Sequence, residues 1–155
     1  MPTLRPATLA DVEAIRALTD AAFEPYVPRM GVRPAPMDAD HAASVREGHV
    51  WVAELDGAIA GFVVLQPQPG HLYLDILAVA PAAQGRGVGA ALLELAETQA
   101  RERGLAEVRL CTNEAMTENL AYYPRRGYAE THRSEQHGFR RVFFRKTVTP
   151  GDARR

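Results

Sequence analysis

The segment that most constrains the fold is a glycine-rich stretch, PAAQGRGVG, at residues 81–89. An apolar run typical of a buried strand precedes it at residues 71–80, and an amphipathic helix is predicted after it at residues 87–103. A further strand is predicted at residues 106–112. A strand, a helix and a strand in this order form a parallel pair with a right-handed crossover. The sequence therefore predicts one parallel unit with a central strand.

The remaining segments predict antiparallel strands and helices around this unit. The dipeptide Asp56-Gly57 lies between two apolar runs and is a strong hairpin signal. Residues 24–38 contain four prolines and a glycine, so we expect a long loop there. Further strands are expected at residues 3–6, 49–55, 58–66, 128–134 and 140–148, and helices at residues 8–23, 38–47 and 117–126. The predicted fold class is α/β, with a mixed, mostly antiparallel central sheet flanked by helices on both faces, in the order β-α-α-β-β-β-α-β-α-β-β.

Composition and charge limit the classes of partner. The chain has 155 residues, and we expect a single domain over residues 1–149 with a frayed tail at residues 150–155. The formal net charge of −1 argues against nucleic acid or a membrane surface as a partner. The only cysteine, Cys111, excludes an internal disulfide, and no apolar run approaches the roughly 20 residues that span a bilayer. We therefore expect a cytoplasmic protein.

The glycine-rich segment is suited to binding phosphate. Gly85, Gly87 and Gly89 let the backbone turn and let a ligand approach the main chain closely. The first N–H groups of the following helix have no partner inside the helix, and the helix dipole favours an anion there. Arg86 can add a charge-assisted contact. The segment is interpreted as a pyrophosphate-binding loop, and a glycine-rich turn without a ligand is the alternative.

Two motifs resemble those of a known family. Residues 84–89, QGRGVG, resemble the Q/R-x-x-G-x-G/A signature of the GCN5-related N-acetyltransferases (GNAT), and a strand precedes them as in that family. Residues 118–128, ENLAYYPRRGY, are similar to the family's helix that ends in Tyr-x-x-x-Gly-Phe/Tyr. The resemblance implies the acyl-CoA N-acyltransferase fold. It also implies an acyltransferase that moves the acetyl group of acetyl-CoA to a primary amine by direct nucleophilic attack.

The resemblance assigns the co-substrate contacts. The loop at residues 84–89 would hold the pyrophosphate of acetyl-CoA, and the preceding strand would pair with the pantetheine arm. The implied contacts are Leu77, Ala78, Val79, Gln84, Gly85, Arg86, Gly87, Val88, Gly89, Ala90, Asn113, Asn119 and Tyr123. We therefore expect acetyl-CoA as the co-substrate.

The resemblance also implies catalytic roles. The Leu77 amide would stabilise the oxyanion, and Tyr123 would donate a proton to the leaving thiolate. The alternative for Tyr123 is a core aromatic, and Pro124 directly after it departs from the family pattern and predicts a bent or short helix. Asp75 shares a strand face with Leu77, and burial would raise its pKa. Three interpretations of Asp75 stay open: the general base, a group that orients the acceptor, and a structural partner of an arginine.

The acceptor pocket is placed by the resemblance beside the proline-rich loop and the hairpin at residues 134–140. The candidate acceptor contacts are Glu24, Tyr26, Asp38 and Tyr73. The acidic residues favour a small cationic amine, although such charges are more often simply solvated. A protein N-terminus or lysine is the alternative acceptor, and a homodimer is a further family expectation. No His or Cys spacing suits a metal, and Cys111 is interpreted as a buried thiol rather than an acetyl carrier.

Two other classes of protein compete with this interpretation. The pattern Gly85-x-Gly87-x-x-Ala90 formally matches a dinucleotide-binding fingerprint. However, the glycines come too late after the strand, and only one parallel crossover is predicted. A non-catalytic CoA-binding module is the second competitor, which the presence of Tyr123 and of the intact glycine loop disfavours.

Overall fold

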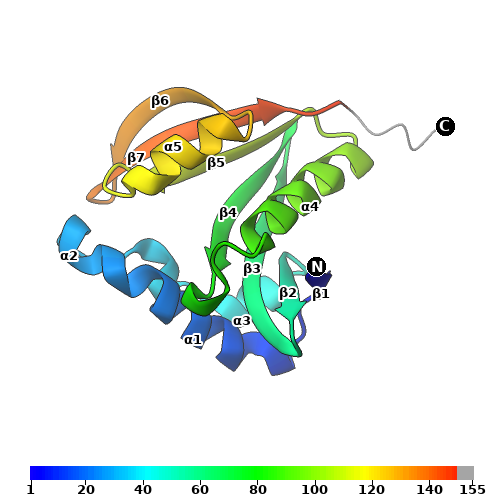
Figure 1. The fold of residues 1–155 in the computed structure, drawn as a ribbon. Helices are drawn as coiled ribbons and strands as arrows, with labels where there is room; N and C mark the ends of the chain where they lie inside the picture. The colour runs from blue at the N-terminus through cyan, green and yellow to red at the C-terminus, as the bar shows by residue number, and fades with distance from the viewer. Residues whose placement is uncertain (150–155) are drawn as a thin grey trace. The chain divides into compact units, whose positions relative to one another are not determined.

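The strands of the computed structural model, which describes residues 1–149, form one mixed sheet (Figure 1). They are β1 (Thr3–Pro6), β2 (Val50–Leu55), β3 (Ala58–Gln68), β4 (His71–Val79), β5 (Glu107–Asn113), β6 (Ala129–Gln136) and β7 (Phe139–Thr147). Their order in the sheet is β1-β2-β3-β4-β5-β7-β6. The β4–β5 pair is parallel, and the pairs β1–β2, β2–β3, β5–β7 and β6–β7 are antiparallel. The predicted tail at residues 150–155 lies outside the described residues.

The main helices follow the predicted order. They are α1 (Val12–Phe23), α2 (Val27–Met30), α3 (His41–Arg46), α4 (Val88–Glu102) and α5 (Thr117–Arg125). The segment expected to be a long loop, residues 24–38, instead contains α2 and two short 3-10 turns. Pro25, Pro28 and Pro36 lie in the first turns of these elements, where a missing N–H breaks no helical hydrogen bond, and Pro34 is the N-cap of the last one.

The chain divides into two compact units. Unit 1 comprises residues 1–65 and 76–95, and unit 2 comprises residues 66–75 and the chain from residue 96. Strands β3 and β4 and helix α4 contribute residues to both units. The expectation of a single domain over residues 1–149 stays a prediction.

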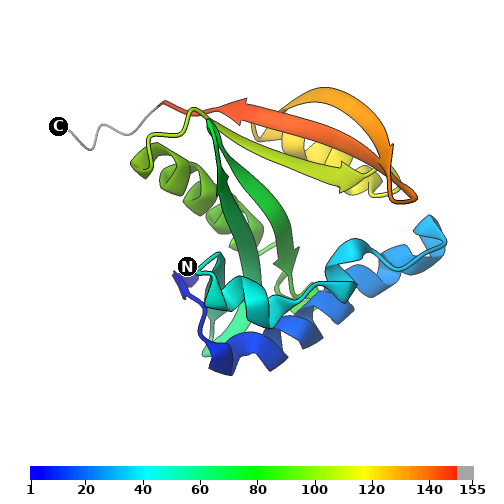
Figure 2. The same cartoon turned by 180° about the vertical axis from the view of Figure 1, so that it is seen from behind.

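The core of unit 1 lies between α1, α3 and one face of β2, β3 and β4. Val12, Ile15 and Leu18 recur at helical spacing in α1, and all three are buried. Alternate residues of the strands form the sheet side of this core. They are Val50, Val52, Phe62, Val64, Ile76 and Ala78. The first half of α4 packs on the opposite face of β3, so this unit has helices on both faces of its sheet (Figure 2).

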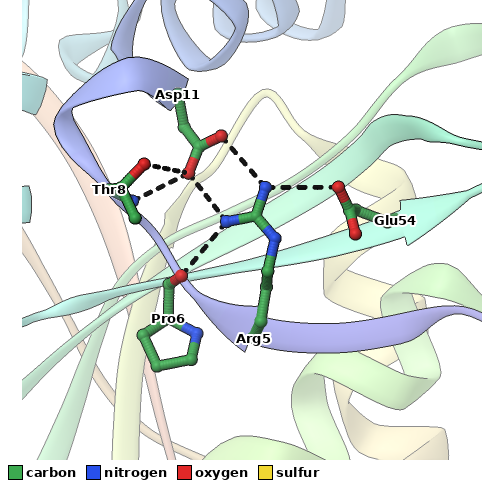
Figure 3. Close-up of polar contacts among 5 residues, drawn as sticks. All are labelled: Arg5, Pro6, Thr8, Asp11 and Glu54. Carbon is green, nitrogen blue, oxygen red and sulfur yellow. Dashed lines mark hydrogen bonds and ion pairs between the residues drawn. The ribbon is translucent and has the colours of Figure 1, made fainter.

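A polar network fixes the start of unit 1 (Figure 3). Arg5 donates to both carboxylate oxygens of Asp11, at 2.8 and 3.0 Å, and to Glu54 of β2 at 3.2 Å. Asp11 also accepts a hydrogen bond from the Thr8 backbone N–H at 2.7 Å, which completes a capping box. The network therefore joins β1, β2 and the beginning of α1. The Arg5 guanidinium lowers the pKa of the Asp11 carboxyl to about 2.

In unit 2, a buried carboxylate joins the second half of α4 to β7. Glu97 is 8% exposed and accepts hydrogen bonds from Lys146 Nζ at 3.0 Å and from Tyr128 Oη at 3.1 Å. The ring centroid of Tyr123 lies 5.8 Å from that of Phe144, which packs α5 on β7. Burial and the charge of Glu97 raise the pKa of the Tyr128 phenol, which therefore stays protonated as a hydrogen-bond donor. These contacts hold α4 and α5 on one face of the unit 2 sheet.

Candidate active site

The predicted phosphate loop lies in unit 1 and is open to a ligand. Gly85 and Gly87 have φ of +80° and +82°, and a Cβ on either glycine would meet no atom within 4 Å. The Ala91 N–H donates to Gly87 O at 3.0 Å, which is the first hydrogen bond of α4. The N–H groups of residues 88–90 precede this bond and have no acceptor inside the helix. The loop therefore presents main-chain donors and the positive end of a helix dipole.

Arg86 adds a positive charge to this loop. Its Nη1 lies 3.1 Å from Asp56 Oδ2 in the turn between β2 and β3. Both side chains are largely exposed, so this ion pair contributes little to stability, on the order of 1 kcal/mol or less. The guanidinium can therefore exchange its carboxylate partner for a phosphate at small cost. The hairpin signal at Asp56 predicted a turn, but no local pattern predicted this pairing.

A glycine that sequence reasoning did not single out sets the position of the loop. Gly61 lies within β3 and faces the first turn of α4. Its hydrogen leaves room for Val88 Cγ1, which is the side chain of the first helical residue. The available signal was a glycine inside a predicted strand, which often marks a close approach of another element.

The parallel ladder between β4 and β5 is short. Its paired residues end at Leu74 and Leu110. Asp75, the last residue of β4 that belongs to unit 2, has no partner in this ladder. Residues 76–79 of the same strand belong to unit 1.

The direction of the β4 N–H groups in unit 1 follows from one hydrogen bond. The Ala80 N–H donates to Ala60 O of β3 at 2.8 Å. Backbone N–H groups alternate in direction along a strand. The N–H groups of Leu77 and Val79 therefore point away from β3. This orientation is the one that the predicted oxyanion role of Leu77 requires.

In unit 2, Tyr73, Asp75 and Cys111 share one face of the sheet. Residues of β4 alternate, with Leu72 and Leu74 buried and Tyr73 and Asp75 on the more accessible face. Tyr73 Oη and Cys111 Sγ lie 3.2 Å apart and share a hydrogen bond. Desolvation raises the pKa of both groups, so the thiol stays protonated and is a poor nucleophile.

Asp75 has the chemistry of a base. The Asp75 residue is exposed, yet packing on the sheet face partly desolvates its carboxylate and raises the pKa. The positive charge of Arg141 on β7 opposes this shift. Within residues 1–149, no ion pair is found for Asp75, so its oxygens are available to a ligand. Arg141 was not predicted as a site residue.

The three remaining predicted contacts of the co-substrate also lie in unit 2. The Asn119 Nδ2 donates to Thr112 Oγ1 at 3.0 Å and so attaches α5 to β5. The Asn113 Oδ1 accepts from the Ala115 N–H at 2.9 Å and shapes the turn before α5. Tyr123 is 6% exposed, with its ring packed among aromatic neighbours. Pro124 lies in the last turn of α5, which continues for only one residue beyond it.

The predicted acceptor contacts divide between the units. Glu24 and Tyr26 lie in one 3-10 turn of unit 1, and Asp38 lies in another. Asp38 accepts a hydrogen bond from Arg33 Nε at 3.2 Å, and this pairing reduces its attraction for a ligand cation. Tyr73 belongs to unit 2. Within residues 1–149, no cluster of three potential metal ligands is found, and no helix is long and apolar enough to cross a membrane.

Comparisons with known proteins identify the family. The model of the acetyltransferase (GNAT) family matches residues 12–128. Similar curated proteins include the mycothiol acetyltransferase of Jonesia denitrificans, 39% identical over 77 residues that make up 48% of this chain and 24% of that protein. Acetyltransferase Atu2258 of Agrobacterium fabrum is 29% identical over 96 residues, or 62% of this chain and 63% of that protein. The chain spans less than two thirds of the length of the curated relatives that it matches.

Solved structures of acetyltransferases have a similar fold. The PaiA N-acetyltransferase of Thermoplasma acidophilum, solved in complex with coenzyme A, superposes with a TM-score of 0.80 at 15% identity. The match covers 96% of this chain and 99% of that one. Because the family model covers residues 12–128, the chain belongs to the acetyltransferase (GNAT) family, and the predicted resemblance is confirmed. The similar solved structure confirms the predicted fold class.

Proposed function

We propose that the protein is an N-acetyltransferase that moves the acetyl group of acetyl-CoA to a small primary amine. The observation that carries this proposal is the arrangement of unit 1. An open glycine loop with unbonded helix amides follows a strand whose Leu77 and Val79 N–H groups point away from the neighbouring strand β3. Family membership supports the same reaction.

The two parts of this arrangement fit two parts of acetyl-CoA. The N–H groups of residues 88–90, the Arg86 guanidinium and the helix dipole would bind the pyrophosphate. The N–H groups of β4 that point away from β3 would pair with the amide groups of the pantetheine arm as an added strand. Ala78 contributes main chain between the two donors, and Gln84 begins the loop. In unit 2, Asn113 and Asn119 would lie along the co-substrate.

The reaction proceeds by direct attack. The amine nitrogen forms a bond to the thioester carbonyl carbon, and the Leu77 N–H stabilises the oxyanion that develops. The C–S bond then breaks, and the products are an amide and CoA thiol. Asp75 accepts the proton that the amine loses, directly or through a water. Tyr123 donates the proton of its phenol O–H to the departing thiolate.

The acceptor is proposed to be a small molecule. The exposed carboxylate of Asp75 suits an amino group, and Glu24, Tyr26 and Tyr73 are the further proposed contacts. A protein N-terminus or lysine is the alternative acceptor. Cytoplasmic location and a homodimer stay predictions.

Calorimetric titration of the purified protein with acetyl-CoA, and in parallel with NAD, tests the proposal. We expect micromolar affinity for acetyl-CoA and no heat from NAD. Release of CoA thiol with a panel of amines would then establish turnover. Binding of NAD alone, or of neither compound, would contradict the proposal.

A further inference from the structure

Two opposite charges on one face of unit 2 lack a charged partner. They are Asp75 of β4 and Arg141 of β7. Among the described residues, no ion pair is found for either side chain. The Arg141 Nη1 donates to the neutral amide oxygen of Gln136 at 3.1 Å, and the guanidinium lies over the Phe139 ring at 5.2 Å from its centroid. The remaining guanidinium donors are available to a ligand.

The strand register places these two residues on the same face. In β5 and β7, Asn113 is opposite Arg141, and in the parallel pair β4–β5, Tyr73 is opposite Arg109. Residues that face each other across a ladder, and their second neighbours along a strand, project to the same side of the sheet. Asp75 and Arg141 therefore project from one face. Burial raises the pKa values of Tyr73, Asp75 and Cys111, and the charge of Arg141 on the same face opposes the shift of each.

Other arginines of this region differ from Arg141 because each has a carboxylate partner. Arg109 and Arg145 both pair with Glu107, at 2.7 and 3.1 Å. Arg133 and Arg140 both pair with Glu114, at 3.5 and 3.6 Å. Arg141 lies on the same strand as Arg145 and Arg140 but has no such partner. A half-buried guanidinium without a carboxylate partner, on the same sheet face as a partly desolvated carboxylate without an ion pair, is complementary to a ligand that carries both charges.

We propose that the acceptor is a small amine that also carries a carboxylate, such as an amino acid, with its amino group at Asp75 and its carboxylate at Arg141. This inference rests on the proposed function and names its substrate class. An arginine fork can bind a carboxylate with two parallel hydrogen bonds, which fixes the orientation of the ligand. A diamine would instead bring its second cation to the guanidinium, where like charges repel. The acceptor would therefore be selected by its carboxylate as well as by its amine.

The test compares each of the twenty common amino acids with its primary amide, which keeps the amine and removes the negative charge. CoA thiol release gives kcat/KM for each member of a pair. We expect at least one amino acid to be acetylated, with kcat/KM about 10- to 100-fold above that of its amide. In R141Q this preference should disappear while the affinity for acetyl-CoA is unchanged. R141K should restore part of it, because a lysine keeps the charge without the fork.

A matched control is R145Q, which removes an arginine from the same strand and face that already has a carboxylate partner. Its preference for the acid over the amide should equal that of the wild type. The inference is overturned if no amino acid is acetylated, if acid and amide react equally, or if R145Q and R141Q behave alike. If acetyl-CoA itself does not bind, both the proposed function and this inference are contradicted. If acetyl-CoA binds and only carboxylate-free amines react, the proposed function stands and this inference alone fails.

Discussion

A Cβ atom on Gly61 would lie 2.8 Å from Val88 Cγ1, and equally 2.8 Å from Ala78 O. Real Cβ atoms do not come so close to other heavy atoms, so only glycine allows the first turn of α4 to pack this tightly on β3 and β4. That turn carries the amides of the phosphate loop. Gly61 therefore sets the position of the loop against the strand whose edge would bind the rest of acetyl-CoA.

Gly61→Ala tests this relationship. We expect the free energy of unfolding to fall by about 1–3 kcal/mol, because the added methyl overpacks a closed contact. Acetyl-CoA affinity should fall as well, because α4 must move. Urea unfolding and calorimetry measure the two effects. Adding Val88→Ala to Gly61→Ala removes one of the two close contacts. The double variant should therefore be more stable than the sum of the two single effects predicts. Strictly additive effects would contradict the close packing.

The structural features that local sequence patterns determine were the ones predicted correctly. The turn at Asp56 and Gly57 has φ of 55° and 81°, the conformation that such a dipeptide favours, and the two strands beside it formed as expected. The open loop glycines were predicted for the same local reason. By contrast, the position of Arg141 on the face of Asp75 depends on the register of β7 on β5, which no pattern within either strand specifies.

The proline-rich segment shows a different limit. Its composition predicted a loop because proline breaks helix interiors, but the structure uses prolines in the first turns of short helical pieces. A composition count does not distinguish these two uses. The ion pairs Arg86–Asp56 and Asp38–Arg33 could not be predicted from the sequence either. The two members of each pair become neighbours only after the surrounding turns have formed.

Gly87→Val and Gly70→Val form a matched pair that separates backbone strain from ligand binding. Both glycines have φ of +82°, and a Cβ on either would meet no atom within 4 Å. Valine at positive φ should therefore destabilise each protein similarly, by about 1–2 kcal/mol. Only Gly87→Val should weaken acetyl-CoA binding, by about tenfold or more, because its side chain would block the approach of a phosphate. Calorimetry on both variants decides, and equal affinities would refute the phosphate-loop interpretation.

Asp75→Asn tests the base. The carboxylate form accepts the proton, so the rate should fall as pH drops through the Asp75 pKa, which burial raises above its ordinary value. The variant should lose this acidic limb of the kcat/KM profile, and kcat should fall by about 100-fold or more. Glu102→Gln, at the exposed end of α4, should keep the wild-type profile. A profile of Asp75→Asn that matches the wild type would remove Asp75 from the mechanism.

Tyr123→Phe tests the proton donor. Phenylalanine keeps the ring contacts with Tyr128 and Phe144, so the fold should be retained. We expect kcat to fall by about 10- to 100-fold with little change in acetyl-CoA affinity, because a donor to the transition state is lost. Tyr122→Phe, one residue earlier and less buried, should leave kcat unchanged. The role is refuted if the two variants have equal kcat.

Asp11→Asn tests the network at the start of α1 through the pH dependence of stability. Arg5 and the Thr8 N–H hold the pKa of Asp11 at about 2, below the ordinary value of 3.8. The unfolded chain therefore binds more protons between these two values, so the contribution of Asp11 is complete above about pH 4 and is lost as pH falls toward 2. The shift corresponds to about 2 kcal/mol. Urea unfolding at pH 5 should show the variant less stable than the wild type by roughly this amount, and the difference should shrink near pH 2.5.

The control is Glu13→Gln, which changes an exposed carboxylate in the first turn of α1. This variant should change the free energy of unfolding by only about 0.5 kcal/mol at either pH. A pH-independent effect of Asp11→Asn would contradict the role of the ion pair.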